Sequence, residues 1–212
     1  MSARRVVLWR HGRTAWNAGS RFQGMTDVPL DEVGIAQADR AARDLATLAP
    51  HAIVASDLER ASATAQALAD LVGLEVTTDE ALRETYAGDW QGLTRDEIVA
   101  RDGDAFAHWV AGHDVRPGGG ESRTEVAARV SAAVRRHVEA LPPGATLVVA
   151  THGGAARSGI GALLGLPIEH WTALGGLVNC AWSVLEEQAD GRWRLVEHNA
   201  RSLPEEVIGD EA

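Results

Sequence analysis

The chain has 212 residues, 45% of them hydrophobic, and a formal net charge of −10, values typical of a globular protein with a sizeable core. The acidic balance argues against nucleic acid or an anionic membrane as the main partner, because both bind basic surfaces. All 20 basic residues are arginines, and the absence of lysine excludes a P-loop and a Schiff-base lysine.

Short apolar runs separated by helical patterns organise the chain. The runs predict strands at 5–9, 52–56, 74–78, 146–151 and 180–186. Apolar residues at helical spacing predict helices at 58–72 and 123–141. This alternation predicts an α/β fold, a three-layer α/β/α sandwich with a mainly parallel central sheet.

Three capping boxes, in which Glu follows Ser or Thr by three residues, predict helix starts. They are Ser56 with Glu59, Thr94 with Glu97, and Ser122 with Glu125. Residues 79–121 interrupt the strand–helix rhythm and include AGHDVRPGGGES, which is too rich in Gly and Pro for a regular element. We expect residues 1–212 to form a single domain, with an excursion at about 79–121 that covers one end of the sheet.

The single cysteine, Cys180, cannot form an intramolecular disulfide, so a reducing compartment is expected. Its surroundings, VNCAWSV, are typical of a buried strand and a packed, unreactive thiol. The sequence has no 18-residue apolar run, and MSARRVVLW lacks the apolar segment of a signal peptide. We therefore expect a cytoplasmic protein.

Basic side chains follow three of the predicted strands. Arg10 and His11 follow the first, Arg60 lies in the first turn of the helix after the second, and His152 follows the run TLVVAT. Ligands of open α/β sheets bind at the carboxyl ends of the strands, so these side chains are expected at one edge. Arg60 lies off the apolar face of its helix, and we expect it to point toward this sheet end or solvent.

Such a cluster requires an anion, because like charges at close range repel one another and lower the pKa of histidines. Phosphate fits best, since guanidinium groups, glycine-turn N–H groups and helix N-termini all bind it. Zinc is the alternative use of histidine, but the sequence has no H-x-x-H or C-x-x-C pair, and Arg10 would repel a cation. We expect no metal and no organic cofactor.

With no nucleophilic Ser or Cys motif, the remaining nucleophile for phosphoryl transfer is histidine. His11 is the better candidate, because a carbonyl in the turn after the strand can hold one ring N–H and leave the other nitrogen free to attack. Release of an alkoxide also requires a proton donor, and Glu84 in ALRETYAGDWQG can supply it. A surface ion pair with Arg83 is the structural alternative for Glu84.

Four segments occur in a recognisable order: RHGRTAWN at 10–17, SDLERASATA at 56–65, LRETYAGDWQG at 82–92 and THGG at 151–154. Along nearly the whole chain the sequence resembles the histidine phosphatase superfamily, which has the phosphoglycerate mutase-like fold. The resemblance implies that His11 is phosphorylated and that Glu84 is the proton donor and later the base for water. It implies that Arg10, Arg60 and His152 form the phosphate pocket.

The resemblance also implies a substrate-binding set, which consists of Asn17, Gln23, Gly24 and Gly153. Position 13 is Arg where the family more often has Gln or Glu, so the contact of Arg13 is left open. The segments LRETYAGDWQGLT, GGGESRTEVAAR and EHWTALGGLVNCAWSVL are similar to those of the glucosyl-3-phosphoglycerate phosphatases. Glu121 and Ser122 could face the substrate, although the capping box already explains Ser122.

The expected activity is therefore hydrolysis of a small phosphorylated metabolite, with glucosyl-3-phosphoglycerate as the leading candidate. The alternatives are a phosphoglycerate mutase and a non-catalytic module that binds a phosphorylated ligand. Cofactor-dependent mutases carry an insertion with a Lys and paired arginines, which this chain lacks. The sequence leaves open a homodimer and whether the 112–120 loop closes over a ligand.

Seven tryptophans are many for this length. Trp9 and Trp182 lie in predicted strands, where we expect them to fill the core. Trp90, Trp109 and Trp171 have two interpretations, because they can either stack on a sugar at the mouth of the site or fill the core.

Overall fold

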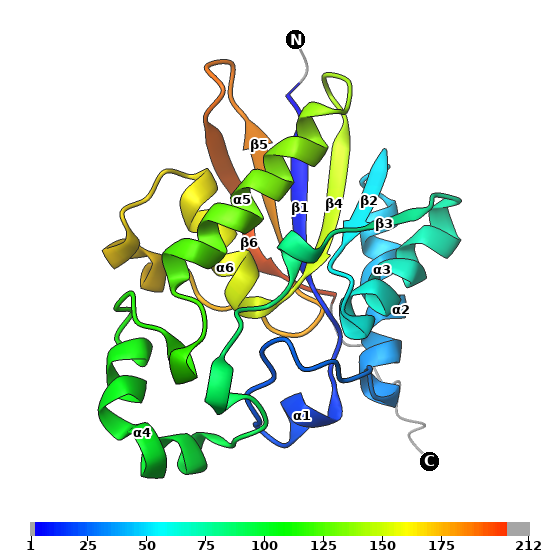
Figure 1. The fold of residues 1–212 in the computed structure, drawn as a ribbon. Helices are drawn as coiled ribbons and strands as arrows, with labels where there is room; N and C mark the ends of the chain where they lie inside the picture. Colours follow the sequence, from blue (N-terminus) through cyan, green and yellow to red (C-terminus); the bar gives the residue numbers. More distant parts are fainter. Residues whose placement is uncertain (1–2, 203–212) are drawn as a thin grey trace, which may run out of the picture.

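Residues 3–202 are described by the computed structural model. A six-stranded sheet with the order β3-β2-β4-β1-β5-β6 runs through its centre (Figure 1). The strands are β1 (Arg5–Arg10), β2 (Ala52–Ala55), β3 (Val76–Thr78), β4 (Thr146–Thr151), β5 (Trp182–Glu187) and β6 (Trp193–Ala200). The first four are parallel, whereas β5 is antiparallel to β1 and β6 is antiparallel to β5. The prediction of an α/β fold with a mainly parallel sheet is confirmed.

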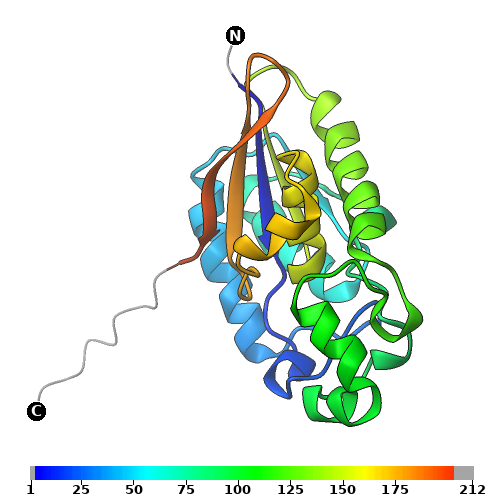
Figure 2. The same ribbon diagram turned by 90° about the vertical axis from the view of Figure 1, so that its left-hand side faces the viewer.

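Helices cover both faces of this sheet, as Figure 2 shows. Helices α2 (Glu32–Ala46) and α3 (Glu59–Val72) pack on one face, and α5 (Arg123–Glu139) and α6 (Gly153–Leu163) pack on the other. The remaining helical elements are α1 (Ala15–Ala18), α4 (Arg95–Val110) and the 3₁₀ turns η1 (Glu80–Leu82), η2 (Gly88–Trp90), η3 (Pro117–Gly119) and η4 (Ile168–Ala173). Within residues 3–202, no helix is long and apolar enough to cross a bilayer.

Strand β1 is apolar on both sides because both sides are buried. Val6 and Leu8 belong to the core beneath α5 and α6, whereas Val7 and Trp9 belong to the core beneath α2 and α3. All four side chains are fully buried. Packing on both faces therefore fixes the strand, and the residues directly after it are held in a defined position.

The segment 79–121 contains η1, η2, α4 and η3 and no strand. In Figure 1 its helix α4 lies with α1 below the carboxyl ends of β1 and β4. A small third core holds it together, in which Trp90 packs with Ile98, Phe22 and Trp109. The fold therefore places this segment at the end of the sheet where ligands of α/β proteins bind.

Two of the three predicted capping boxes are present, at Thr94 and at Ser122. The prediction at Ser56 is wrong, because α3 begins at Glu59 and the Ser56 side chain does not cap it. The backbone N–H of Glu59 instead donates to the Asp27 carboxylate at 2.9 Å. A side chain from a distant loop therefore takes the place of the local cap.

The C-terminal part of the sheet differs from the sequence prediction. Strand β6 was not predicted, and β5 begins at Trp182 rather than at Cys180. Cys180 lies in the preceding turn with a positive φ of 58°. Its thiol is buried, as expected, and burial raises its pKa to about 12. The thiol therefore stays protonated and unreactive near neutral pH.

Candidate active site

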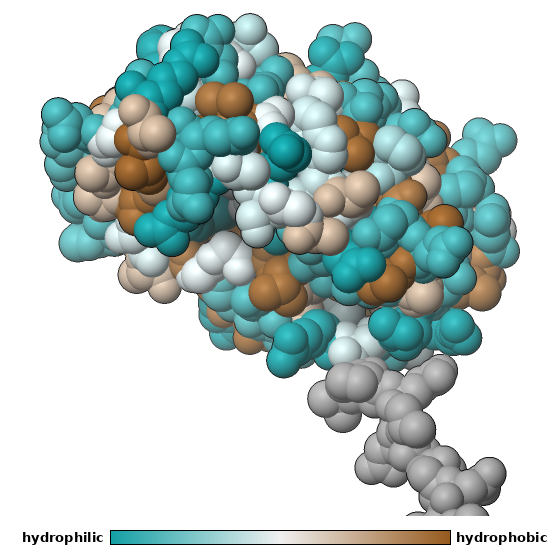
Figure 3. Space-filling view, turned by 90° about the horizontal axis from the view of Figure 1, so that it is seen from below, coloured by the Kyte–Doolittle hydropathy of each residue, from teal (hydrophilic) through white to brown (hydrophobic). Residues whose placement is uncertain are grey.

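A cavity of about 370 Å³ opens at the carboxyl end of β1. Seen from below the sheet, the surface is mostly hydrophilic with scattered apolar residues and is hollowed left of centre (Figure 3). Eight of the nine predicted site residues line the cavity: Arg10, His11, Asn17, Gln23, Gly24, Arg60, Glu84 and Gly153. The ninth, His152, is fully buried beside His11, with 5.1 Å between the ring centroids.

His11 has a defined tautomer. Its Nδ1 lies 2.7 Å from the carbonyl oxygen of Gly12, and a carbonyl can only accept, so Nδ1 carries the proton. The other nitrogen, Nε2, therefore has a free lone pair. Burial, reinforced by the positive charges of Arg10 and Arg60, lowers the pKa of His11 well below its usual value. The imidazole is thus neutral and nucleophilic at physiological pH.

Whereas His11 is held through Nδ1, His152 is held through Nε2. Its Nε2 lies 2.9 Å from Ser56 Oγ, and Nδ1 is buried without a hydrogen-bond partner among the described residues. Burial, followed by the charge of Arg60, lowers its pKa well below the usual value. His152 is therefore a second neutral imidazole at this point.

Arg10 and Arg60 are fixed by backbone carbonyls rather than by carboxylates. Arg10 Nη1 donates to Leu177 O at 2.6 Å, and Arg60 donates to Thr26 O and Gly24 O, both at 2.8 Å. Among residues 3–202, neither guanidinium forms a direct ion pair. Burial lowers the pKa of Arg60 to about 10, so Arg60 remains charged at neutral pH, and burial also lowers the pKa of Arg10 from its ordinary value. Arg60 is fully buried, so the solvent-facing alternative for it is wrong.

Glu84 approaches the same cavity from the segment between β3 and α4. Its carboxylate accepts from the backbone N–H groups of Thr85 at 2.8 Å, Gly154 at 3.0 Å and Ala155 at 2.9 Å. Two of these donors are the unpaired N–H groups at the start of α6, which favour an anion. A Cβ at Gly154 would lie 2.7 Å from Glu84 Oε1, so a larger residue there would displace the carboxylate. The surface ion pair of Glu84 with Arg83 is absent, because Arg83 pairs with Asp57.

The donors at this site need an anion. Within residues 3–202, four buried side-chain nitrogen or oxygen atoms have no hydrogen-bond partner, and three of them are Arg10 Nε, Arg60 Nε and His152 Nδ1. Buried polar groups without partners are rare in proteins and usually mark a ligand or a functional role. A tetrahedral oxyanion can accept from several such donors at once. The geometry is therefore suited to binding a phosphate group next to the free nitrogen of His11.

Comparison with known proteins agrees with this geometry. The family model described as "Histidine phosphatase superfamily (branch 1)" matches residues 6–201. The chain belongs to the histidine phosphatase superfamily.

Relatives of this histidine phosphatase include named phosphatases and probable mutases. It is 44% identical to the glucosyl-3-phosphoglycerate phosphatase of Mycobacterium tuberculosis, over 94% of this chain and 96% of the relative. It is 37% identical to a probable phosphoglycerate mutase of Yersinia pestis, over 86% and 85% of the two chains. The solved structure of mycobacterial glucosyl-3-phosphoglycerate phosphatase with VO3 superposes with a TM-score of 0.89 at 45% identity, covering 93% of this chain and 100% of the other.

The predicted substrate-binding residues of this phosphatase differ in how they contribute. Asn17 Oδ1 accepts from Asn179 Nδ2 at 3.2 Å, and Gln23 Oε1 accepts from the Thr14 hydroxyl at 3.0 Å. Because protein donors occupy both side-chain oxygens, the two amide N–H₂ groups are the parts left for a ligand. The carbonyl of Gly24 instead holds Arg60.

Gly153 lies beside Arg10 at the start of α6. A Cβ at this position would meet Nε and Cζ of Arg10 at 3.4 and 3.5 Å, which are ordinary contact distances. The Arg10 guanidinium therefore lies against the first turn of α6, and the space there does not by itself require glycine.

Several residues that support the site of this phosphatase were missed by the sequence analysis. Ser56 holds His152, and Asn179 donates to the carbonyl of His11 at 3.1 Å. Arg129 and Glu121 form an ion pair behind Glu84, so Glu121 faces Arg129 rather than the cavity. No sequence pattern identifies these residues, because each contact joins segments that are distant in the chain.

The open contact of Arg13 is resolved. Its Nε donates to the Asp31 carboxylate at 2.8 Å, and Asp31 is the N-cap of α2. Arg13 therefore ties the loop after β1 to the start of α2 and does not line the cavity.

The structure decides between sugar stacking and core filling for the three tryptophans left open by the sequence. Trp109 lines the cavity, so it can contact a ligand. Trp90 is buried in the third core, and its Nε1 donates to Asp102 at 2.8 Å. Trp171 is also buried, and its Nε1 donates to Leu166 O at 2.9 Å. Trp90 and Trp171 therefore fill the core, as Trp9 and Trp182 do.

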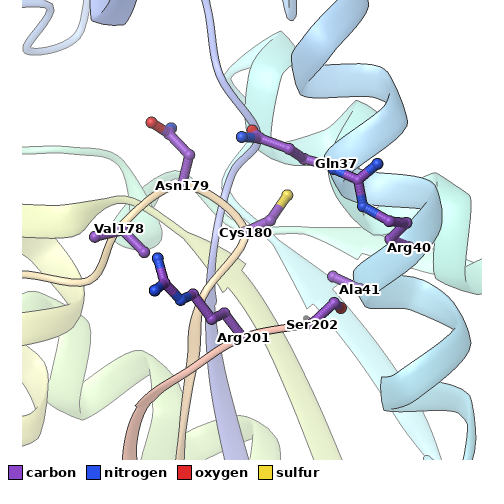
Figure 4. Close-up of a pocket in the computed structure, with 8 residues that line it drawn as sticks. All are labelled: Gln37, Arg40, Ala41, Val178, Asn179, Cys180, Arg201 and Ser202. Carbon is purple, nitrogen blue, oxygen red and sulfur yellow. The ribbon is translucent and has the colours of Figure 1, made fainter. Parts of the chain in front are cut away.

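A second cavity of about 350 Å³ is lined in part by the loop 178–180 (Figure 4). Gln37 and Arg40 from α2 line it together with Cys180 and Arg201. Its described lining contains no histidine and no carboxylate, and the Cys180 thiol is protonated. This cavity therefore lacks the acid–base and nucleophilic groups that the first cavity has.

Proposed function

We propose that this histidine phosphatase hydrolyses the phosphate monoester of a small metabolite through a phosphohistidine at His11. The observation that carries the proposal is the free Nε2 of His11 among the unpartnered nitrogens of Arg10, Arg60 and His152, with the Glu84 carboxylate at the same cavity. A phosphate placed there has a nucleophile, charge stabilisation and a proton carrier within one site.

In the first step, Nε2 of His11 attacks phosphorus in line with the ester oxygen. The P–O bond breaks, its electron pair goes to the leaving oxygen, and Glu84 gives that oxygen a proton. Arg10, Arg60 and His152 bind the phosphoryl oxygens, and the Gly12 carbonyl stabilises the positive charge of the phosphorylated imidazole through Nδ1–H.

In the second step, water attacks phosphorus on the opposite side from His11. Glu84, now a carboxylate, takes the proton of this water, and the P–N bond breaks. Inorganic phosphate leaves, and His11 regains its free nitrogen. Each step uses groups that the chain itself supplies.

The leading substrate is glucosyl-3-phosphoglycerate, because relatives of 43 to 44% identity that nearly match this chain in length carry that name. Trp109 on the cavity wall offers an apolar aromatic face for a sugar. A mutase is the second candidate, supported by the name of the 37% identical relative. Isomerised phosphoglycerate in the presence of a bisphosphorylated primer distinguishes the two. A cytoplasmic location and a homodimer remain predictions.

The nucleophile is tested by trapping. During turnover of a phosphate monoester, acid-labile phosphate should accumulate on His11 after rapid denaturation and be located by mass spectrometry. His11→Ala should lose at least 10³-fold in kcat, roughly the scale on which covalent catalysis acts. His113→Gln, which removes an exposed histidine, serves as the control and should keep full activity. Substantial activity in His11→Ala, or label on another residue, overturns the assignment.

A further inference from the structure

Arg157 lies in the cavity wall and has no role in the proposed mechanism. It lies in α6, is partly buried and lines the cavity together with Arg10 and Glu84. No hydrogen bond or ion pair joins its guanidinium to another of residues 3–202. Its guanidinium nitrogens are therefore available to a ligand in the cavity.

The other arginines near the site each donate to at least one protein acceptor, although Nε of Arg10, Arg60 and Arg123 has no partner among the described residues. Arg10 and Arg60 donate to carbonyls, and Arg21 donates to Gly92 O at 2.7 Å. Arg123 donates to Trp109 O at 2.6 Å, and its guanidinium lies 5.2 Å from the centre of the Trp109 ring. Arg157 is thus the cavity arginine that makes no hydrogen bond at all within the described chain.

The position of Arg157 follows from the helix that carries it. Gly153 begins α6 and backs Arg10, and Arg157 is four residues further on. Four residues span about one helical turn, or about 6 Å along the axis, and return to the same face. Arg157 therefore lies one turn beyond Gly153 along α6, in the lining of the same cavity as Phe22 and Trp109.

The electrostatics at this end of the cavity favour one further negative charge. Arg123 and Arg157 repel each other, and Glu84, the carboxylate that stabilises Arg157, is held by backbone N–H groups at the start of α6. Burial lowers the pKa of Arg157 from its ordinary value, yet the group stays charged at neutral pH. An anion here would relieve the repulsion between the two guanidinium groups.

We propose that Arg157 binds a carboxylate of the substrate, so that the site selects phosphorylated hydroxy acids over simple phosphate esters. The inference rests on the proposed function and adds a specificity subsite to it. The planar guanidinium fork matches a carboxylate with two parallel hydrogen bonds, and a single such group balances its single charge. The phosphate occupies the pocket at Arg10 and Arg60, and the carboxylate lies one helical turn away.

The test uses two substrates that differ in one group. 3-Phosphoglycerate has a carboxylate where glycerol 3-phosphate has a hydroxymethyl group. Arg157→Met keeps the apolar stem of the side chain and removes its charge, and it should lower kcat/KM for 3-phosphoglycerate about 10- to 100-fold, mainly by raising KM. It should leave glycerol 3-phosphate within about twofold of the unmodified enzyme. Arg157→Lys should restore part of the loss, because the charge returns without the fork.

The matched control is Arg135→Met on α5, which removes the same charge from a residue outside the cavity lining and should change neither substrate. If Arg157→Met affects both substrates equally, or neither, the carboxylate subsite is wrong while phosphatase activity stands. If the unmodified enzyme hydrolyses no phosphate monoester, the proposed function fails and the subsite fails with it. Comparable loss with a bisphosphorylated ester that has no carboxylate would assign Arg157 to a second phosphate and overturn the carboxylate.

Discussion

At the level of single residues, the hydrogen bond between Ser56 and His152 sets the form of a buried imidazole. Ser56 Oγ accepts from the Leu58 N–H at 3.3 Å, so its own hydrogen is available to His152 Nε2 at 2.9 Å. With Ser56 as the donor, the imidazole proton lies on Nδ1, which has no partner in the described chain. His152 then presents a hydrogen-bond donor, which is the form that a phosphoryl oxygen needs.

We expect Ser56→Ala to lower kcat/KM about tenfold, because the tautomer and ring orientation of His152 are no longer fixed. Steady-state kinetics with a phosphate monoester measures the effect. Ser183→Ala is the matched control, since Ser183 is also fully buried and its Oγ lies 3.0 Å from His198 Nδ1, away from the cavity. Both variants should lose about 1 kcal/mol of stability. An equal kinetic loss in the two variants would assign Ser56 a purely structural role.

Ser56 also shows where local sequence patterns fail. Ser56 and Glu59 match a capping box by spacing alone. The fold places His152 against Ser56 and gives the helix N–H to Asp27, contacts that join residues 96 and 32 positions apart. A tertiary contact has therefore replaced the local one, and no window of sequence around Ser56 contains the residues that decide it.

At the level of elements, the segment that carries Glu84 is held by a side chain from α5. Between η1 and η2 this segment has no ladder or helix to pair its carbonyls. Arg129 donates to the carbonyls of Ala81 at 2.9 Å, Arg83 at 2.6 Å and Glu84 at 2.9 Å. Its other partner is Glu121, which also accepts from the Tyr86 N–H at 2.8 Å. Arg129 and Glu121 thus fix the backbone on both sides of Glu84.

Arg129→Met should therefore impair the proton-transfer role of Glu84. We expect kcat to fall at least tenfold for an alkyl phosphate, but less for p-nitrophenyl phosphate, whose leaving group departs without a proton. The free energy of unfolding should fall by about 2–3 kcal/mol, since three carbonyls and Glu121 lose a charged partner. Arg136→Met on the same helix breaks an exposed pair with Asp79 and should leave kinetics unchanged. Equal losses of kcat for both leaving groups would contradict a link through Glu84.

Five of the six strands were predicted, whereas the strand β6 and the helices α2 and α6 were not. Strands β1, β2 and β4 are almost entirely buried, so their sequences are continuous apolar runs that stand out. The edge strand β6 has mixed, half-exposed residues, and its pattern resembles a loop. A strand is thus visible in the sequence to the extent that its side chains are buried.

At the level of the whole molecule, the fold concentrates positive charge in an acidic protein. The chain has a net charge of −10, yet Arg10, Arg60 and Arg157 line one cavity. Residues that follow strands, such as His11, were predictable, because the carboxyl ends of parallel strands converge. Arg157 was not, since an arginine within a helix usually lies on the surface and nothing in its neighbours marks the cavity.

Burying two neutral histidines in this positive site couples stability to pH. The pKa values of His11 and His152 are well below the usual value in the folded chain, through burial and then the charges of Arg10 and Arg60. In the unfolded chain both titrate near about 6.5. Below that pH the unfolded state takes up protons that the folded state does not, so stability falls as pH falls. Above it neither state binds these protons, and the effect disappears.

As the pH falls from 6.5 to 5, each of these histidines should lower the free energy of unfolding by up to about 1.4 kcal/mol per pH unit. The double variant His11→Gln/His152→Gln should show a correspondingly flatter dependence, measured by urea unfolding in phosphate-free buffer, because phosphate would stabilise the folded state by binding. His170→Gln, which removes an exposed histidine, should keep the original slope. Asp57 and Asp79 also have lowered pKa values, but aspartates in the unfolded chain titrate near about 3.9, below this window. An unchanged slope in the double variant would mean that His11 and His152 take up protons in the folded state, and the neutral nucleophile would be wrong.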